Sequence, residues 1–281
     1  MPYSSLNLGG ELIHFDTPKV MGILNATPDS FFEGSRCTTE KEIENRIIKI
    51  IDQGADIIDV GAYSSRPDSV DISPDEEWSR LETALRILRD KYPQAIVSVD
   101  TFRSQIARKA VSEYGVQMIN DISGGELDRE MFQAVADLNC AYIMMHMKGT
   151  PQTMQQYCHY TDLFQDICHY FVEKLDRLRE LGVANVVLDP GFGFSKTMDQ
   201  NYELMSIMEH FSILGKPLLV GISRKSMIYK LLNINPEESL NGTTVLNTVA
   251  VQKGADILRV HDVKEAVELV KITQKLNEKN K

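Results

Sequence analysis

Short aliphatic runs alternate with stretches of helical periodicity along the whole chain. Eight such runs are VMGILN (20–25), DIIDVG (56–61), AIVSVD (95–100), QMIND (117–121), AYIMMH (141–146), NVVLDP (185–190), PLLVGIS (217–223) and DILRVH (256–261). Strands that are covered on both faces have such continuous apolar stretches, because neither face meets water. The pattern therefore predicts eight buried strands.

Helices are expected between these strands. Thr39 followed by Glu42 is the pattern of a capping box, and isoleucines at helical spacing follow it, so a helix is predicted over 39–53. Ser73-Pro74-Asp75-Glu76 marks a second helix start, with a serine cap and a proline at the first helical position. Further helices are predicted over 104–114, 164–181, 201–210 and 240–253, and a hairpin is predicted around residues 9–10.

Strands and helices that alternate eight times within 281 residues favour an α/β fold of the (β/α)8 TIM-barrel type, with a short N-terminal hairpin. A doubly wound open sheet is the main alternative, because it has the same alternation. The sequence has no linker-like stretch rich in Pro, Gly or Ser, no low-complexity segment and no block of charge. We therefore expect residues 1–281 to form a single domain.

Composition and charge argue against several classes of protein. The chain is 43% hydrophobic and 25% charged, as in ordinary soluble proteins. Its net charge of -10 argues against a nucleic-acid partner, which would require a basic face. We see neither the apolar core of a signal peptide nor an apolar run long enough to span a bilayer. No CxxC pair occurs among Cys37, Cys140, Cys158 and Cys168, so we expect reduced thiols and a cytoplasmic location without membrane association.

Nearly every predicted strand ends in a polar side chain. The polar ends are Asn25, Asp59, Asp100, Asn120-Asp121, His146, Asp189, Ser223-Arg224-Lys225, and Arg259 with His261. The active site of a TIM barrel forms where the carboxyl ends of the strands meet. Residues two apart in a strand point the same way, so Arg259 and His261 should face this site together. The pattern predicts a ring of polar groups around one pocket.

Each polar strand end also has a simpler structural explanation. Asp100 could cap the following helix, and Asn120-Asp121 could form a turn. His146 by itself is more often a structural hydrogen-bonding group than a catalyst. Arg224-Lys225 would ordinarily be a solvated surface pair. The occurrence of polar ends on nearly every predicted strand favours a site over these separate explanations.

Several loops have a composition suited to ligands. ATPDSFFEGS (26–35) has two phenylalanines that either close over a flat ligand or pack beneath the loop. AYSSRPDS (62–69) offers hydroxyls and an arginine to an anion. The glycines of DPGFGFSKT (189–197) permit close approach to a ligand, although the GxGxxG spacing of a dinucleotide site is absent. SRKS (223–226) opens a helix, where a carboxylate or phosphate is favoured.

Together, these stretches resemble the dihydropteroate synthase family from about residue 20 to 263. The matching motifs, in order, are VMGILNATPDSF, DVGAYSSRP, SVDT, NDISGG, MHMKGTPQTM, LDPGFGFSKT, GISRKS and RVHDV. The resemblance implies a TIM-barrel transferase of folate biosynthesis that is usually a homodimer and is inhibited by sulfonamides. It also implies the reaction, in which 6-hydroxymethyl-7,8-dihydropterin diphosphate and 4-aminobenzoate give dihydropteroate and pyrophosphate by a dissociative, Mg²⁺-assisted substitution.

The resemblance also implies residue roles. The implied pterin site consists of Asp100, Asn120, Met145, Asp189, Lys225 and Arg259. The implied diphosphate site consists of Asn25, Ser65, Arg66, Arg259 and His261, with Asn25 as the Mg²⁺ ligand. The implied 4-aminobenzoate site consists of Phe31, Pro67, Phe194, Lys225 and Ser226. The implied catalytic residues are Asp100, Lys225, Arg259 and Glu33.

Two positions depart from the common family pattern. Glu33 stands where an aspartate is expected, which keeps the charge and lengthens the reach. Asp68 stands where Gly-Ala often follows the Arg-Pro pair, and it would disfavour a nearby carboxylate unless it points away. Two other functions are compatible with the fold, a pterin-dependent methyltransferase and an inactive pterin-binding paralogue. A methyltransferase would have little use for a diphosphate site, and the intact ring of polar residues argues against an inactive paralogue.

Overall fold

The structure is a computed structural model that describes residues 5–8, 10–26, 39–64 and 71–278. Parallel strands form a central barrel, namely β3 (Lys19–Asn25), β4 (Ile57–Gly61), β5 (Ile96–Asp100), β6 (Met118–Asp121), β7 (Ala141–Met145), β8 (Val186–Asp189), β9 (Leu219–Val220) and β10 (Ile257–Val260). Consecutive strands are neighbours, and β10 pairs with β3. A parallel bridge between Leu188 and Leu218 joins β8 to β9 and closes the ring. The predicted TIM barrel is confirmed, and the open sheet is excluded.

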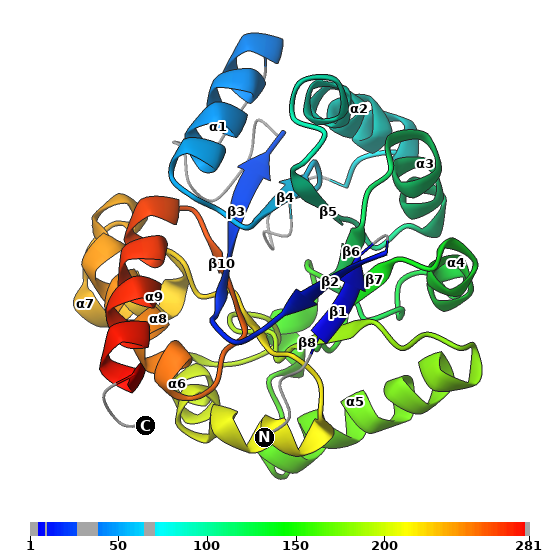
Figure 1. The fold of residues 1–281 in the computed structure, drawn as a ribbon. Coiled ribbons are helices and arrows are strands. Elements are labelled where there is room, and N and C mark those ends of the chain that lie inside the picture. Colours follow the sequence, from blue (N-terminus) through cyan, green and yellow to red (C-terminus); the bar gives the residue numbers. More distant parts are fainter. Residues whose placement is uncertain (1–4, 9, 27–38, 65–70, 279–281) are drawn as a thin grey trace.

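Helices surround this barrel on its outside (Figure 1). They are α1 (Glu40–Asp52), α2 (Pro74–Lys91), α3 (Ser104–Tyr114), α4 (Met131–Leu138), α5 (Leu163–Glu180), α6 (Met198–Ile207), α7 (Ser226–Leu232), α8 (Leu240–Gln252) and α9 (Val263–Glu278). Short 3-10 helices occupy Met154–Tyr157, Met208–Leu214 and Pro236–Glu238. No helix within the described ranges is long and apolar enough to cross a membrane.

The predicted helix starts are mostly confirmed. Thr39 forms the capping box with Glu42, and the Ser73 side chain accepts a hydrogen bond from the Glu76 N–H. The start predicted at residue 201 is wrong. Helix α6 begins at Met198 because Thr197 and Gln200 form a capping box of their own.

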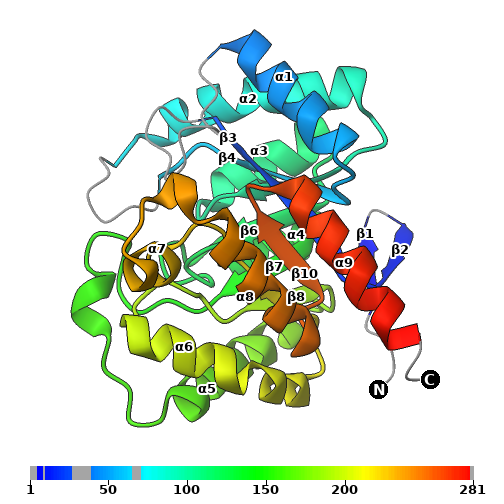
Figure 2. The same cartoon turned by 90° about the vertical axis from the view of Figure 1, so that its left-hand side faces the viewer.

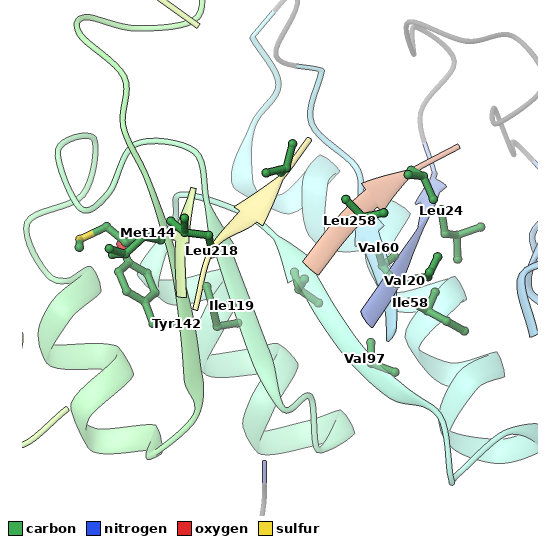
Figure 3. Close-up of a cluster of buried hydrophobic side chains, with 14 of the residues drawn as sticks. Val20, Leu24, Ile58, Val60, Val97, Ile119, Tyr142, Met144, Leu218 and Leu258 are labelled. Atoms are coloured by element: carbon green, nitrogen blue, oxygen red, sulfur yellow. The ribbon is translucent and has the colours of Figure 1, made fainter. Parts of the chain in front are cut away.

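The outward-facing side chains of the strands pack against the helices in one apolar layer. Val20 and Leu24 of β3 lie beside Ile58 and Val60 of β4 in this layer (Figure 3). Close packing here depends on Gly22, because a Cβ at this position would lie 2.7 Å from Ile50 Cγ2 of α1. Burial of this layer supplies most of the driving force for folding.

The N-terminal hairpin closes one end of the barrel. It consists of β1 (Ser5–Leu8) and β2 (Glu11–His14), which pair antiparallel, as predicted. Leu6, Leu8 and Phe15 pack against inward-facing side chains of the barrel, which are Met21, Ile57, Met118, Ala141, Ile143, Val187, Leu219 and Ile257. The hairpin lies at the end away from α7 (Figure 2). It leaves the carboxyl ends of the strands free for a site.

We expect Leu6→Ala to destabilise the protein, because Leu6 is only 2% exposed in this plug. The free energy of unfolding should fall by about 2–4 kcal/mol, which is typical for truncating a buried leucine. Urea unfolding followed by circular dichroism measures this change. Leu12→Ala on the same hairpin is the control, since Leu12 is 58% exposed. Equal losses in both variants would contradict the proposed plug.

Candidate active site

A cavity of about 410 Å³ lies at the carboxyl ends of the barrel strands. Seven residues expected from the sequence line it, namely Asn25, Asp100, Phe194, Lys225, Ser226, Arg259 and His261. Asn120, Met145 and Asp189 are not on its wall and are at most 6% exposed. Phe31, Glu33, Ser65, Arg66 and Pro67 lie outside the described residues. The barrel therefore brings most of the predicted site residues that the structure describes to one cavity.

An arginine between two carboxylates forms the centre of this site. Arg259 Nε lies 2.6 Å from Asp59 Oδ2, and its NH2 lies 2.7 Å from Asp100 Oδ2. Burial raises the pKa of Asp100 to about 7, although Arg259 opposes this shift. Burial also lowers the pKa of Arg259, but Asp59 and Asp100 outweigh it and raise that pKa above its ordinary value. The three side chains form a partly buried ion cluster with one net negative charge when both acids are ionised.

Asp59 is a site residue to which the sequence analysis gave no role. It is fully buried, and its Oδ2 also accepts a hydrogen bond from Asn120 Nδ2 at 3.2 Å. Its other oxygen, Oδ1, is buried and has no hydrogen-bond partner among the described residues. An acid inside an aliphatic strand was the available signal, since such a charge is costly without a partner.

The structure confirms some of the simpler explanations for the polar strand ends and excludes others. Asp100 does not cap α3, because Asp128 Oδ2 accepts from the Ser104 N–H instead. Asp121 does form a turn, in which it accepts from Ser123 and from the Gly125 N–H. His146 is buried and lies edge-on to Tyr170, with ring centroids 4.8 Å apart. His146 is therefore a structural residue, while Asp100 is part of the site.

Asp189 and Lys225 influence each other electrostatically at the site. Asp189 Oδ1 accepts a hydrogen bond from the Gly191 N–H at 2.8 Å. Burial raises the pKa of Asp189, and the nearby charge of Lys225 opposes this shift. Burial lowers the pKa of Lys225 to about 8, opposed by Asp189. Lys225 Nζ donates to the Phe192 carbonyl and lies 4.6 Å from the centre of the Phe194 ring.

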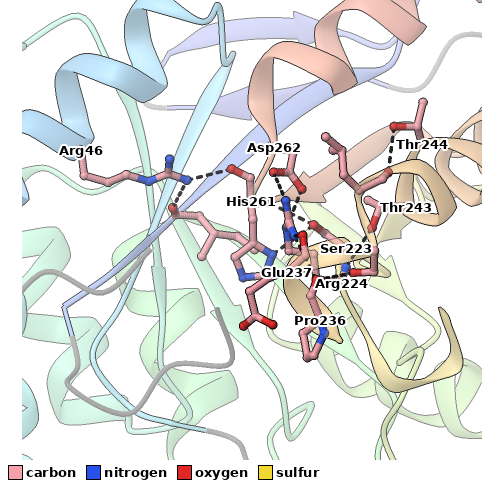
Figure 4. A network of polar contacts seen from close by, with 12 residues as sticks. Arg46, Ser223, Arg224, Pro236, Glu237, Thr243, Thr244, His261 and Asp262 are labelled. Carbon is pink, nitrogen blue, oxygen red and sulfur yellow. Dashed lines mark hydrogen bonds and ion pairs between the residues drawn. The ribbon is translucent and has the colours of Figure 1, made fainter. Parts of the chain in front are cut away.

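Arg224 holds the loops after β9 and β10 together (Figure 4). It is 7% exposed, makes two hydrogen bonds to Asp262 and donates to the carbonyls of Pro236 and Glu237. The interpretation of Arg224-Lys225 as a solvated surface pair is therefore wrong. The reason is that its partner Asp262 lies 38 residues further along the chain, at a separation from which the sequence does not predict a contact.

His261 contacts Ser223, the residue before Arg224, and its imidazole is neutral. Its Nδ1 lies 3.0 Å from Ser223 Oγ, and its carbonyl accepts from Arg46 NH2 of α1 at 2.9 Å (Figure 4). Burial, followed by the charges of Arg259 and Arg46, lowers its pKa well below the ordinary value. Arg46 was not predicted as a site residue, although it is a charged residue on the apolar face of α1, between Ile43 and Ile47. Arg46 holds the end of β10 against α1.

The cavity has an oxygen donor suited to a hard cation. A Cβ built on Gly61 would lie 3.7 Å from both Asn25 Oδ1 and Asp100 Oδ2, so these oxygens flank the same strand end. Within the described ranges, no cluster of three His, Cys, Asp or Glu side chains could hold a metal ion. Mg²⁺ often takes one or two protein ligands and fills its other positions with water and phosphate oxygens. The donors present fit that mode of binding.

Apolar side chains cover one side of this polar site. Ile122, Met145, Met147, Met154 and Phe194 form a separate buried cluster. Acids at the barrel end, cations beside them and an apolar wall together suit a flat, nitrogen-rich ring that bears an anionic group.

Known proteins are similar to this chain in both sequence and fold. A model of the family described as pterin binding enzyme matches residues 21–261. The chain is 38% identical to dihydropteroate synthase of Escherichia coli K12 over 267 residues, which cover 94% of each chain. It is 39% identical to dihydropteroate synthase of Synechocystis over 260 residues, which cover 92% of this chain and 89% of the relative.

Solved structures agree with the sequence relatives. The Yersinia pestis dihydropteroate synthase in complex with a sulfonamide drug has a TM-score of 0.93 and 34% identity, over 98% of this chain and 100% of its own. The Xanthomonas albilineans dihydropteroate synthase with 4-aminobenzoic acid has a TM-score of 0.88 and 32% identity, over 98% of both chains. The similarity includes the strands that carry the site and the helices around them. The chain therefore belongs to the pterin binding enzymes, and within them to the dihydropteroate synthases.

Proposed function

We propose that the chain condenses 6-hydroxymethyl-7,8-dihydropterin diphosphate with 4-aminobenzoate to give 7,8-dihydropteroate and pyrophosphate. One observation carries this proposal, namely that Asp100 of β5, Arg259 of β10 and Lys225 line one cavity, with the buried acids Asp59 and Asp189 behind its wall. The acids suit the N–H groups of a pterin, and the cations suit a diphosphate. A methyltransferase would not need the cations, because its pterin carries no diphosphate.

The pterin would bind at the acidic end of the site. A carboxylate accepts two neighbouring N–H groups in a fork, which is the role proposed for Asp189. Asn120 would bind the adjacent ring nitrogen, and Lys225 would donate to the ring carbonyl. Met145 would cover one face of the ring and Arg259 the other, by stacking. Arg259 would have to leave Asp100 at least in part, because it bridges Asp59 and Asp100 in this structure.

The diphosphate and Mg²⁺ would lie at the cationic rim of the cavity. Arg259, His261, Ser65 and Arg66 are the proposed diphosphate ligands, and Asn25 is the proposed Mg²⁺ ligand. When bound, Mg²⁺ would neutralise charge on the diphosphate and make it a better leaving group. The 4-aminobenzoate would lie between Phe31, Pro67, Phe194 and Lys225, with its carboxylate at Ser226. We expect sulfonamides to compete with 4-aminobenzoate for this site.

The reaction is a substitution at the pterin methylene carbon. The carbon–oxygen bond to the diphosphate breaks, and its electron pair leaves with the pyrophosphate. Positive charge then develops on the methylene and the ring, where Asp100 would stabilise it electrostatically. The lone pair of the aniline nitrogen forms the new carbon–nitrogen bond, and the nitrogen loses a proton. Glu33, Lys225 and Arg259 are the other proposed catalytic residues, and no protein nucleophile is needed.

A direct assay tests this proposal. Purified protein is mixed with the pterin diphosphate, 4-aminobenzoate and Mg²⁺, and both pyrophosphate and dihydropteroate are measured. We expect the two products in equal amounts, no dihydropteroate when 4-aminobenzoate is withheld, and neither product when Mg²⁺ is withheld. Pterin binding without either product would instead indicate an inactive paralogue.

Asp189→Asn should weaken pterin binding, because an amide N–H₂ would then face a ligand donor. The expected loss is about 1.5–3 kcal/mol, the usual contribution of a hydrogen bond to a charged group. Calorimetry with a pterin that lacks the diphosphate measures it. Asp256→Asn is the matched control, because Asp256 accepts from the Leu218 N–H at the opposite end of the barrel. An unchanged dissociation constant in Asp189→Asn would remove this residue from the site.

The pH dependence of catalysis should follow Asp100 and Lys225. Asp100 is proposed to act as the carboxylate and Lys225 as the ammonium, so kcat/KM should rise through pH about 7 and fall above about 8. The rising limb should disappear in Asp100→Asn. A limb that persists unchanged in this variant would belong to the phosphate of the substrate rather than to Asp100.

We also propose that the chain forms a homodimer through the neighbouring helices α7 and α8. Leu231, Leu232 and Val245 are 55%, 50% and 54% exposed on these helices, which suits an interface. A glutamate at Val245 should raise the dimer dissociation constant at least about tenfold, because a charge would be buried there. Sedimentation equilibrium measures this constant. Ile213→Glu is the control, at a residue that is 80% exposed outside these helices. A dimer unaffected by Val245→Glu would place the interface elsewhere.

A further inference from the structure

Lys196 is a buried lysine on the wall of the cavity, directly after the turn that follows β8. Burial lowers the pKa of Lys196 to about 7. Its protonated form carries three N–H donors, and three acceptors surround it, which are His146 Nδ1 at 3.1 Å, the Gly191 carbonyl at 3.0 Å and the Phe194 carbonyl at 3.1 Å. None of these acceptors is a carboxylate. The residue is 3% exposed, so water contributes little to this arrangement. The number of donors matches the number of acceptors.

His146 is in the right state to complete this tripod of acceptors. Burial, followed by the charge of Lys196, lowers the pKa of His146 well below its ordinary value. The imidazole is therefore neutral, and its Nδ1 lone pair can accept from the ammonium. The turn also packs tightly on this segment, because a Cβ at Gly191 would lie 2.0 Å from the His146 carbonyl oxygen. Lys196 thus ties the turn after β8 to the end of β7.

The turn that Lys196 holds carries groups proposed for the site. The Phe192 carbonyl accepts from Lys225, and the Phe194 ring forms part of the cavity wall. The Gly191 N–H donates to Asp189. Asn201 also binds the turn, because its Oδ1 accepts from the Gly193 N–H at 2.6 Å. Lys196 binds the turn through the carbonyl groups of Gly191 and Phe194.

We propose that Lys196 is a positioning residue for the 4-aminobenzoate half of the reaction. It holds the carbonyls of Gly191 and Phe194, and so sets where Phe194 and the Phe192 carbonyl meet Lys225. This inference rests on the proposed function, because it assigns the aniline substrate to the space beside Phe194. A lysine suits this role better than a serine or threonine, since one ammonium can bind three acceptors that diverge.

The first test compares Lys196→Met with Lys174→Met. Methionine keeps much of the volume and removes the three donors. Lys174 is the matched control, because it is 4% exposed and pairs with Glu126 on the outside of the barrel. We expect Lys196→Met to raise KM for 4-aminobenzoate roughly tenfold, since small misplacements of positioning groups have effects of this size or larger. KM for the pterin diphosphate should change less than about threefold. Lys174→Met should change neither constant.

A second measurement does not depend on turnover. Hydrogen exchange followed by mass spectrometry reports the protection of amides in residues 191–195, including the Phe194 N–H, which donates to the Gly191 carbonyl at 3.1 Å. We expect Lys196→Met to speed exchange there by roughly tenfold, with less change elsewhere, because local opening of the turn becomes easier. His146→Leu removes one acceptor and should have a smaller effect in the same direction. This variant serves if Lys196→Met fails to fold.

The outcomes separate this inference from the proposed function. Wild-type protein that yields no dihydropteroate would refute the function, while the exchange data still report on the turn. Active wild type with equal rises in both KM values, or a lowered melting temperature with unchanged KM values, would overturn the role of Lys196. A selective rise in KM for 4-aminobenzoate together with faster exchange at 191–195 supports it.

Discussion

Two carboxylates buried close together raise each other's pKa unless a cation lies between them. Arg259 is that cation for Asp59 and Asp100, which it reaches from β10 across the barrel end. The attraction offsets part of the cost of removing three charges from water. It also requires β3 to lie between β4 and β10, so the cluster forms only when the ring of strands closes. The geometry of the site therefore depends on the completed barrel.

The barrel is divided into an apolar end and a polar end. The hairpin plug with Leu6, Leu8 and Phe15 fills the amino-terminal end with hydrocarbon. The carboxyl ends hold the ion cluster, Asp189 and Lys225 in surroundings where burial is the largest cause of each pKa shift. Low polarity strengthens the interactions that remain. The same packing that stabilises the fold thus shifts the pKa values of Asp100 and Lys225 toward neutral pH.

The side chains on the cavity wall carry more positive than negative charge, although the whole chain is acidic. The protein has a net charge of -10, yet Arg259, Lys225 and a neutral His261 line its cavity. Local cations decide the binding of an anion, because distant surface charges are screened by salt. Arg224 and Arg46 keep the cationic segments in place through carbonyl groups and Asp262. Their role is to hold the loops and strand ends from which the site is built.

The sequence by itself determined the order of strands and helices, the barrel, most helix caps and the strand ends that carry polar groups. These features depend on local periodicity and on residues a few positions apart, which can be read along one segment. Partnerships between distant segments, such as Arg259 with Asp59, Arg224 with Asp262 and Lys196 with His146, were decided by the tertiary structure alone. A buried charge is stable only with a partner at contact distance, and chain separations of 38 to 200 residues give no such distance until the barrel has closed.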